Sequence, residues 1–192
     1  MTFSFYDVAT STVNANLNTL EHLVSRAEAS SVITAAAGEK PVGELRLAPD
    51  MLDFGFQIRF ASEICAKLIA RVHGEDAPTF PIGLTDVKTY EDIRTILKFA
   101  KEYVAKADKA KFEANISQQV DLEAGPYQWK MPAEKYFRYF SLPGIYFHVT
   151  TAYAILRNKG LDLGKLDFLT GHGMAQDPEV ITIRGPDTET AK

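Results

Sequence analysis

The chain has 192 residues and a formal net charge of −4, and this length is enough for one well-packed domain. It has one cysteine, so it cannot form an internal disulfide. The Lys and Arg residues are scattered, so no basic surface is predicted and nucleic-acid binding is excluded. The apolar runs are much shorter than the roughly 20 residues that span a bilayer, and the N-terminus lacks the pattern of a signal peptide. We therefore expect a soluble, cytoplasmic protein without membrane association.

The first predicted element is a long amphipathic helix from residue 3 to residue 29. Apolar residues, with Tyr6 at the start of the stripe, recur there at spacings of three and four. Residues 35–43 contain Gly38, Pro41 and Gly43, so this segment is predicted to be a connection.

A second helix is predicted to run from Leu47 to Gly74, with Pro49 in its first turn. Asp50 and Gln57 are seven residues apart and would project from its apolar face. Buried polar groups are costly without partners, so the pair needs an explanation. Asp50 is either an N-terminal cap or a site residue, and Gln57 is either an interhelical hydrogen-bond former or a site residue. Cys65 falls on the same stripe and is predicted to be a buried hydrophobic residue.

A loop is predicted over residues 75–84, followed by a third helix that Thr89 and Asp92 open as an approximate capping box. This helix is predicted to run to Val104, and the charged segment after it is predicted to be its frayed end.

Two short strands are predicted next, at Ile116–Leu122 and Tyr127–Met131, joined through Ala124-Gly125-Pro126. Such a hairpin would be a lid over one end of a helical bundle. Trp129, the only tryptophan, would then line a pocket beneath the lid, or would simply pack against it.

The last predicted helix starts at Pro143, after a short helical turn at residues 133–140, and ends at Asn158-Lys159-Gly160. His148 lies inside this helix at the edge of the apolar stripe. It is either a core histidine with both ring nitrogens hydrogen-bonded, or a ligand or acid–base group in a cleft.

Residues 170–192 are rich in glycine, proline and polar residues and are predicted to form a mobile tail, whereas residues 1–169 are predicted to form one domain. Within the tail, Val180–Arg184 has strand character and His172 is predicted to be solvated. No phosphate-binding glycine loop, zinc-protease motif, paired-cysteine motif or serine-hydrolase elbow is present anywhere in the sequence.

Several blocks of this sequence resemble a known family. The segment FHVTTAYAILR at residues 147–157, followed by DLGKLDFL, is similar to the C-terminal signature of DUF1993, a domain of unknown function. Further similar blocks are RLAPDM at residues 46–51, QIRFASEICAKLIAR at residues 57–71 and TYEDI at residues 89–93. That family is placed among the DinB/YfiT-like four-helix proteins, many of them metalloenzymes and often dimers, so the resemblance implies a homodimer.

The resemblance also implies where a metal site would lie. The group's usual site takes one histidine from the second helix and a pair four residues apart on the last helix. His148 matches one of that pair, but position 152 is Ala152, and the second helix offers Asp50 or Gln57 instead of histidine. We therefore predict no cofactor, with a weak divalent-metal site at Asp50 and His148 as the alternative.

The patterns and the resemblance together predict an all-α fold, an antiparallel four-helix bundle with a small β-hairpin between the third and fourth helices. The first functional hypothesis is a pocket for a small-molecule ligand at one end of the bundle. Its lining is predicted to include these residues: Tyr6, Asp50, Gln57, Trp129, His148 and Tyr153.

In a metal-free enzyme of the isomerase or dehydratase type, His148 would be the general base or acid, Asp50 would orient it, and Tyr153 would stabilise a developing oxyanion. The second hypothesis is a metal-dependent hydrolase or transferase with Asp50 and His148 as ligands. The third is a non-catalytic, dimeric binding or stress-related module whose polar core residues fix the helix register.

Overall fold

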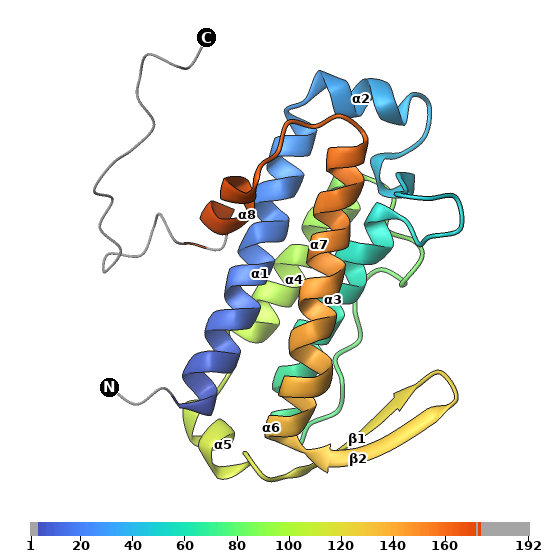
Figure 1. The fold of residues 1–192 in the computed structure, drawn as a ribbon. Helices are drawn as coiled ribbons and strands as arrows, with labels where there is room; N and C mark the ends of the chain where they lie inside the picture. The colour runs from blue at the N-terminus through green and yellow to red at the C-terminus, as the bar shows by residue number, and fades with distance from the viewer. Residues whose placement is uncertain (1–3, 172, 174–192) are drawn as a thin grey trace, which may run out of the picture.

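The computed structural model describes residues 4–171 and 173. Four long helices lie side by side as a bundle, and a two-stranded hairpin leaves one end of it (Figure 1). The predicted four-helix fold with a hairpin between the third and fourth long helices is confirmed. The long helices are α1 (Phe5–Glu28), α3 (Phe54–His73), α4 (Tyr90–Val104) and α7 (Leu142–Asn158).

Helix directions follow from the contacts at the two ends of the bundle. The start of α3 at Gly55 lies against Val87, just before α4, and the end of α3 at His73 accepts a hydrogen bond from the backbone of Asp108, just after α4. These two helices therefore run in the same direction, and the segment 75–88 returns along the bundle between them. Both are antiparallel to α1 and α7 (Figure 1).

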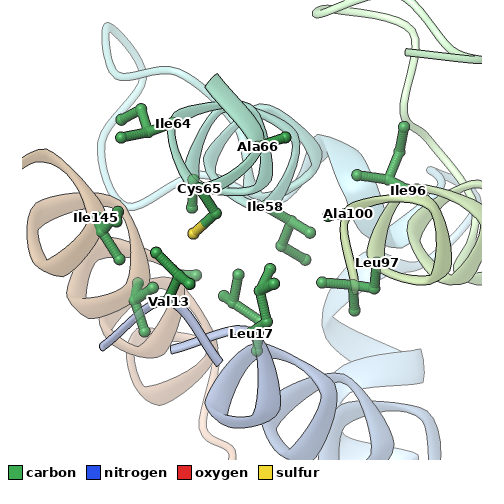
Figure 2. Close-up of a cluster of buried hydrophobic side chains, with 14 of the residues drawn as sticks. Val13, Leu17, Ile58, Ile64, Cys65, Ala66, Ile96, Leu97, Ala100 and Ile145 are labelled. Atoms are coloured by element: carbon green, nitrogen blue, oxygen red, sulfur yellow. The ribbon is translucent and has the colours of Figure 1, made fainter. Parts of the chain in front are cut away.

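One apolar core fills the space between the four helices. Figure 2 shows Val13 and Leu17 of α1 facing Cys65 of α3, Leu97 of α4 and Ile145 of α7, all of them buried. Burial raises the pKa of the Cys65 thiol because the thiolate would lose its hydration. Cys65 is thus a core side chain, as its position in the apolar stripe predicts.

Helix α4 begins as its sequence predicts. Thr89 accepts a hydrogen bond from the backbone of Asp92, whose carboxylate accepts one from the backbone of Thr89, which completes the capping box of α4. Ser4 and Asp7 form the same arrangement at the start of α1. Each box satisfies backbone N–H groups that have no partner inside the helix.

The predicted start of the second long helix is wrong. Helix α3 begins at Phe54, and Asp53 is its N-cap, because the Asp53 Oδ1 accepts the backbone N–H of Phe56 at 3.0 Å. Asp50 lies in an exposed turn three residues earlier, so it does not share a helical face with Gln57. Pro49 sits in that turn and not in a helix, since proline at the second position of a turn is as favourable as at a helix start.

Two short helical segments occupy the connection between α1 and α3. These are α2 (Ser31–Ala37), which the sequence analysis did not predict, and the 3₁₀ turn η1 (Val42–Glu44). Gly43 and Gly55 let the backbone near Val87 approach, since a side-chain carbon at either position would overlap the carbonyl oxygen of Val87. The backbone N–H of Gly43 also donates to the carbonyl of Lys88 at 2.8 Å.

The charged segment after α4 is not a frayed end. It forms the short helix α5 (Lys109–Ala114), capped by Asp108, whose carboxylate accepts the backbone N–H of Lys111 at 3.0 Å. Phe112 anchors this helix in the core. A single buried aromatic residue among lysines was too weak a periodic signal to predict the helix.

The hairpin consists of β1 (Gln119–Ala124) and β2 (Tyr127–Pro132), close to the predicted strands. Leu122 lies opposite Trp129, and Asp121 lies opposite Lys130. Directly opposite residues point to the same face, so one face carries the buried Leu122 together with Trp129, and the other carries the Asp121–Lys130 ion pair.

Helical structure does not begin at Pro143, contrary to the prediction. It runs without a break through α6 (Ala133–Tyr136), a π-helical segment η2 (Phe137–Ser141) and α7. Proline inside a helix removes one hydrogen bond and its ring crowds the carbonyl four residues earlier, here that of Tyr139. The wider π turn lies at this position and accommodates the proline.

The end of α7 agrees with the sequence, because Gly160 adopts a positive φ of 94° after Lys159. A further short helix, α8 (Lys165–Gly171), packs on α1. Helix α8 was not predicted from the sequence, and it crosses the predicted domain boundary at residue 169. Val180–Arg184 and His172 lie outside the described residues. No helix in the described part of the chain is long and apolar enough to cross a membrane.

Candidate functional site

Helices α3 and α7 bring Gln57 and His148 together. The Nδ1 atom of His148 lies 2.7 Å from Oε1 of the buried Gln57, and the Gln57 side-chain nitrogen donates to the carbonyl of Leu52 at 3.0 Å. Because the Leu52 carbonyl can only accept, the amide nitrogen of Gln57 must face it, and its oxygen must face the histidine. That oxygen also only accepts, so Nδ1 of His148 carries the proton.

The other ring nitrogen of His148 is therefore an acceptor. In the described part of the chain no group forms a hydrogen bond with Nε2. Aromatic rings surround the imidazole, with centroid distances of 4.8 Å to Phe60, 5.1 Å to Phe147 and 6.2 Å to Phe56. This burial lowers the pKa of His148 to about 4, because the imidazolium would lose its hydration. At neutral pH the ring is therefore uncharged. Its Nε2 atom can accept a proton or bind an electrophile, but the ring cannot act as an imidazolium acid.

The other predicted site residues lie elsewhere. Tyr6 packs edge-on against Phe112, at the end of the bundle where α3 finishes. Its distance from Gln57 follows from the length of α3, since Gln57 lies in the first turn and His73, which also packs on Phe112, is the last residue. At 1.5 Å per residue the two positions are about 24 Å apart along the helix axis.

Tyr153, Asp50 and Trp129 also do not converge on His148. The Tyr153 hydroxyl donates to the carbonyl of Leu163 at 3.1 Å, and its ring packs on Phe168, so it holds the segment after α7. Asp50 is exposed, and Trp129 is 44% exposed on the hairpin. Of the six residues predicted from the sequence, the structure brings together Gln57 and His148.

A groove that the sequence analysis did not predict runs along α3 beneath the hairpin. Its volume is about 320 Å³. Phe60, which contacts the His148 ring, lines one end, and Arg71 and Tyr136 line the other. Leu122 of the hairpin covers it.

Charged residues recur along this face of α3 at every fourth position. They are Arg59, Glu63, Lys67 and Arg71. The spacing of four places them in one row on the helix surface, and this was the signal that could have revealed the groove from the sequence.

The first three members of the row compensate one another. Arg59 is buried, its Nη1 lies 2.6 Å from Oε2 of Glu63, and its Nε donates to the carbonyl of Ile82 at 2.9 Å. Lys67 forms a second ion pair with Glu63. Burial opposes ionisation of Glu63, but the hydrogen bonds and charges of Lys67 and Arg59 outweigh it and lower the pKa of Glu63.

Arg71 is different, because it has no carboxylate partner in the described part of the chain. Its Nη1 donates to the hydroxyl of Tyr136 at 2.5 Å, and its guanidinium carbon lies 4.8 Å from the centre of the Tyr136 ring. Tyr136 is fully buried. Its hydroxyl accepts from Arg71, and among the described residues the hydroxyl hydrogen has no acceptor.

A model of a domain of unknown function, DUF1993, matches residues 5–169. The chain belongs to the DUF1993 family. A crystal structure described as a DinB family member protein from Shewanella denitrificans is similar in fold, with a TM-score of 0.72 and 24% sequence identity. The match covers 85% of this chain and 90% of that one, and at this identity it shows the fold alone. No curated protein matches the chain.

The residues of this DUF1993 chain do not fit the three-histidine metal site that the resemblance implies. The residue one turn after His148 is Ala152, which is fully buried in the core. The α3 partner of His148 is the amide of Gln57, and Asp50 lies outside α3. Within the described residues, no group of three or more histidine, cysteine or acidic side chains is placed to hold a metal ion.

Proposed function

We propose that this DUF1993 protein binds a small organic molecule beside His148 and that Nε2 of His148 accepts a proton from it. The observation that carries the proposal is the chain of hydrogen bonds from the Leu52 carbonyl through Gln57 to Nδ1 of His148. A buried glutamine whose amide is oriented by the backbone holds the imidazole in one tautomer, and this tautomer presents a lone pair at the surface.

The surroundings of His148 favour a particular substrate chemistry. In the free protein the imidazole is a weak base, because burial lowers its pKa to about 4. A negative charge on a bound substrate would raise that pKa towards neutrality, since an opposite charge stabilises the imidazolium. The proposal therefore specifies proton abstraction next to a carbonyl in a small anionic substrate, a step in isomerisation or dehydration, with the rings of Phe56 and Phe60 excluding water.

A non-catalytic binding module is the second candidate function. The side chain of Leu52, whose carbonyl binds Gln57, is 49% exposed, and the ring of Phe147, 5.1 Å from the His148 ring, is 60% exposed. Exposed apolar side chains of this kind mark interaction surfaces as well as active sites. In this candidate, the family's expected homodimer forms through this face, and Gln57 and His148 fix the register of α3 and α7.

The catalytic proposal is tested by hydrogen–deuterium exchange at a substrate carbon. Pyruvate, oxaloacetate and acetoacetate are incubated with the protein in D₂O, and loss of the proton signals next to the carbonyl is followed by NMR. We expect the protein to accelerate exchange of at least one probe, and His148→Gln to lose at least about 10²-fold of that rate. His22→Gln, on α1, is the matched control and should keep the rate.

Equal exchange rates for the wild type and His148→Gln would contradict the catalytic proposal. The binding module is tested by light scattering, with Phe147→Ser as the variant. A wild-type dimer that becomes a monomer on this substitution would support the second candidate, and a wild-type monomer would contradict it.

A further inference from the structure

We infer that the groove between α3 and the hairpin is a binding site for a small organic carboxylate, with Arg71 and Tyr136 holding the carboxylate and an apolar floor holding the rest of the molecule. This site is separate from the proton-accepting site at His148. It rests on the unused hydrogen-bond donors of Arg71 and Tyr136 and on the missing ion-pair partner of Arg71 at one end of the groove.

Arg71 and Tyr136 have donors left over. Arginine carries five N–H donors in a planar fork, and the one side-chain hydrogen bond of Arg71 goes to the Tyr136 hydroxyl. Tyr136 is fully buried, and its hydroxyl hydrogen has no acceptor among the described residues. A carboxylate has two acceptor oxygens, so it would take one N–H from the guanidinium and the O–H of the tyrosine together.

Arg71 is the cation of this groove that lacks an ion-pair partner in the described part of the chain. Arg59 and Glu63 form a buried pair, and Lys67 shares the same carboxylate. Of the two cations that line the groove, Lys67 pairs with Glu63, whereas Arg71 has no carboxylate partner among the described residues. The hairpin contributes Glu123, whose carboxylate already accepts a hydrogen bond from Gln128 at 2.8 Å. A carboxylate ligand would supply the partner that Arg71 lacks.

The remaining lining is apolar and small. Phe60, Ile64, Leu122 and Phe140 line the groove between its charged end and the His148 ring. A volume of about 320 Å³ is at the lower end of the range for ligand pockets, so the predicted ligand is a short aliphatic or aromatic acid.

The carboxylate site and His148 are independent. Phe60 contacts the His148 ring and lies eleven residues before Arg71, which corresponds to about 16 Å along α3. A small acid bound at Arg71 therefore does not reach Nε2 of His148. Failure of one proposal leaves the other standing.

Binding is tested with hexanoate, using hexanamide as the uncharged probe of the same shape. Affinity is measured by NMR chemical-shift titration and by the fluorescence of Trp129, which shares the groove-facing side of the hairpin with Leu122. We expect hexanoate to bind at least tenfold more tightly than hexanamide, with the largest shifts at residues of α3, the hairpin and α6.

Variants assign the effect to the groove. Arg71→Gln should weaken hexanoate binding at least tenfold and leave hexanamide unchanged, and Tyr136→Phe should weaken it several-fold. Lys130→Gln removes the same charge from the outer face of the hairpin, where Lys130 pairs with Asp121, and should have no effect. His148→Gln should also leave hexanoate binding unchanged.

Equal affinity for the acid and the amide would overturn the inference, as would equal losses in Arg71→Gln and Lys130→Gln. Shifts located away from the groove would do the same. If Arg71→Gln does not fold, the wild-type comparison of the two probes and the Tyr136→Phe variant decide the outcome.

Discussion

At the scale of single residues, the most informative side chain is His148. Its sequence position at the edge of an apolar stripe predicted an inward-facing histidine, and the structure places it partly buried, with one ring nitrogen bonded to Gln57. The predicted alternatives were a fully bonded core residue or a group in a cleft. The observed side chain has features of both, because Nδ1 is hydrogen-bonded to Gln57 and Nε2 has no partner among the described residues.

The partner of His148 could be narrowed but not chosen from the sequence. Asp50 was predicted to orient His148, and Gln57 was predicted either to line the pocket or to form an interhelical hydrogen bond, both on a helix predicted to start at Leu47. The correct start at Phe54 separates them, since Asp53 caps the helix and Asp50 remains in the preceding turn. Either aspartate can cap a helix, so residue type alone does not show which one does.

The lowered pKa of His148 predicts how stability depends on pH. The folded protein binds this proton only near pH 4, whereas an unfolded histidine binds it near pH 6.5, so the unfolded state holds more protons between these values. Stability contributed by the neutral imidazole is complete above pH 6.5. It is lost as the pH falls to about 4, with a slope of at most about 1.4 kcal/mol per pH unit.

The measurement is urea denaturation at several pH values, for the wild type and His148→Gln. The free-energy difference between them should change across pH 4–6.5 and be constant above it. A difference that is the same at pH 4.5 and pH 7.5 would contradict the lowered pKa.

At the scale of secondary-structure elements, the start of α3 determines the position of Gln57 and hence of His148. Asp53 caps the helix and also lies 3.3 Å from the Arg46 guanidinium and from the Lys88 ammonium group. One carboxylate therefore joins α3 to the segments on either side of it. The cap is more than a local feature, because Leu52, the residue before it, orients the Gln57 amide.

Asp53→Ala is predicted to destabilise the protein by about 1–2 kcal/mol, since it removes the cap and leaves two cations without their shared partner. Asp50→Ala is the matched control and should change the stability by less than about 0.5 kcal/mol, as an exposed turn residue. Thermal and urea unfolding measure both. Equal losses would support the earlier, Leu47 start of the helix.

Close backbone approach at Gly55 gives a second prediction. A methyl group there would overlap the Val87 carbonyl, so Gly55→Ala should cost about 1–3 kcal/mol despite the higher helix propensity of alanine. Gly144→Ala meets only the end of the Ile64 side chain at 3.1 Å and should be neutral or stabilising by up to about 1 kcal/mol. Urea denaturation of the two variants checks this. A stable Gly55→Ala would mean that the segment at Val87 does not pack against α3.

Helix boundaries and short helices were predicted less accurately from the sequence than the four long helices. The capping box at Thr89 and the helix-ending Gly160 could be predicted from the sequence, because each involves residue types that one conformation strongly favours. Pro143 was misleading, since proline marks a helix start in most contexts but here follows a π turn. Helix α5 depends on Phe112 entering the core, which is a tertiary contact that no local pattern encodes.

At the scale of the whole molecule, the bundle separates residues that were predicted to line one pocket. The predicted pocket combined residues from the first, second and last long helices. Tyr6 of α1, however, lies near the end of α3, whereas Gln57 lies in its first turn. The crossover at residues 75–88 makes α3 and α4 parallel, so helix order alone did not show which ends meet. The outer face of α3 instead connects His148, through Phe60, to the charged row that ends at Arg71.

Membership of the DUF1993 family accounts for the fold and leaves the chemistry to the residues themselves. The DinB family structure shares the bundle at 24% identity. Where the resemblance implies histidines, this chain has Ala152 on the last helix and, on the predicted second helix, Asp50 or Gln57. In this chain the amide oxygen of Gln57 accepts a hydrogen bond from Nδ1 of His148. The central claim is therefore that His148 is a neutral imidazole with its proton on Nδ1 and a free lone pair on Nε2.

Long-range ¹H–¹⁵N correlation spectra of the histidine rings test this claim most directly, with His148→Gln to assign the signals. At pH 6, where an ordinary histidine is largely protonated, the spectrum should show His148 neutral, with Nδ1 bearing the proton and Nε2 resonating as an unprotonated nitrogen. Gln57→Leu should mix the two tautomers. A protonated imidazolium at pH 6, or a proton on Nε2 in the wild type, would contradict the account.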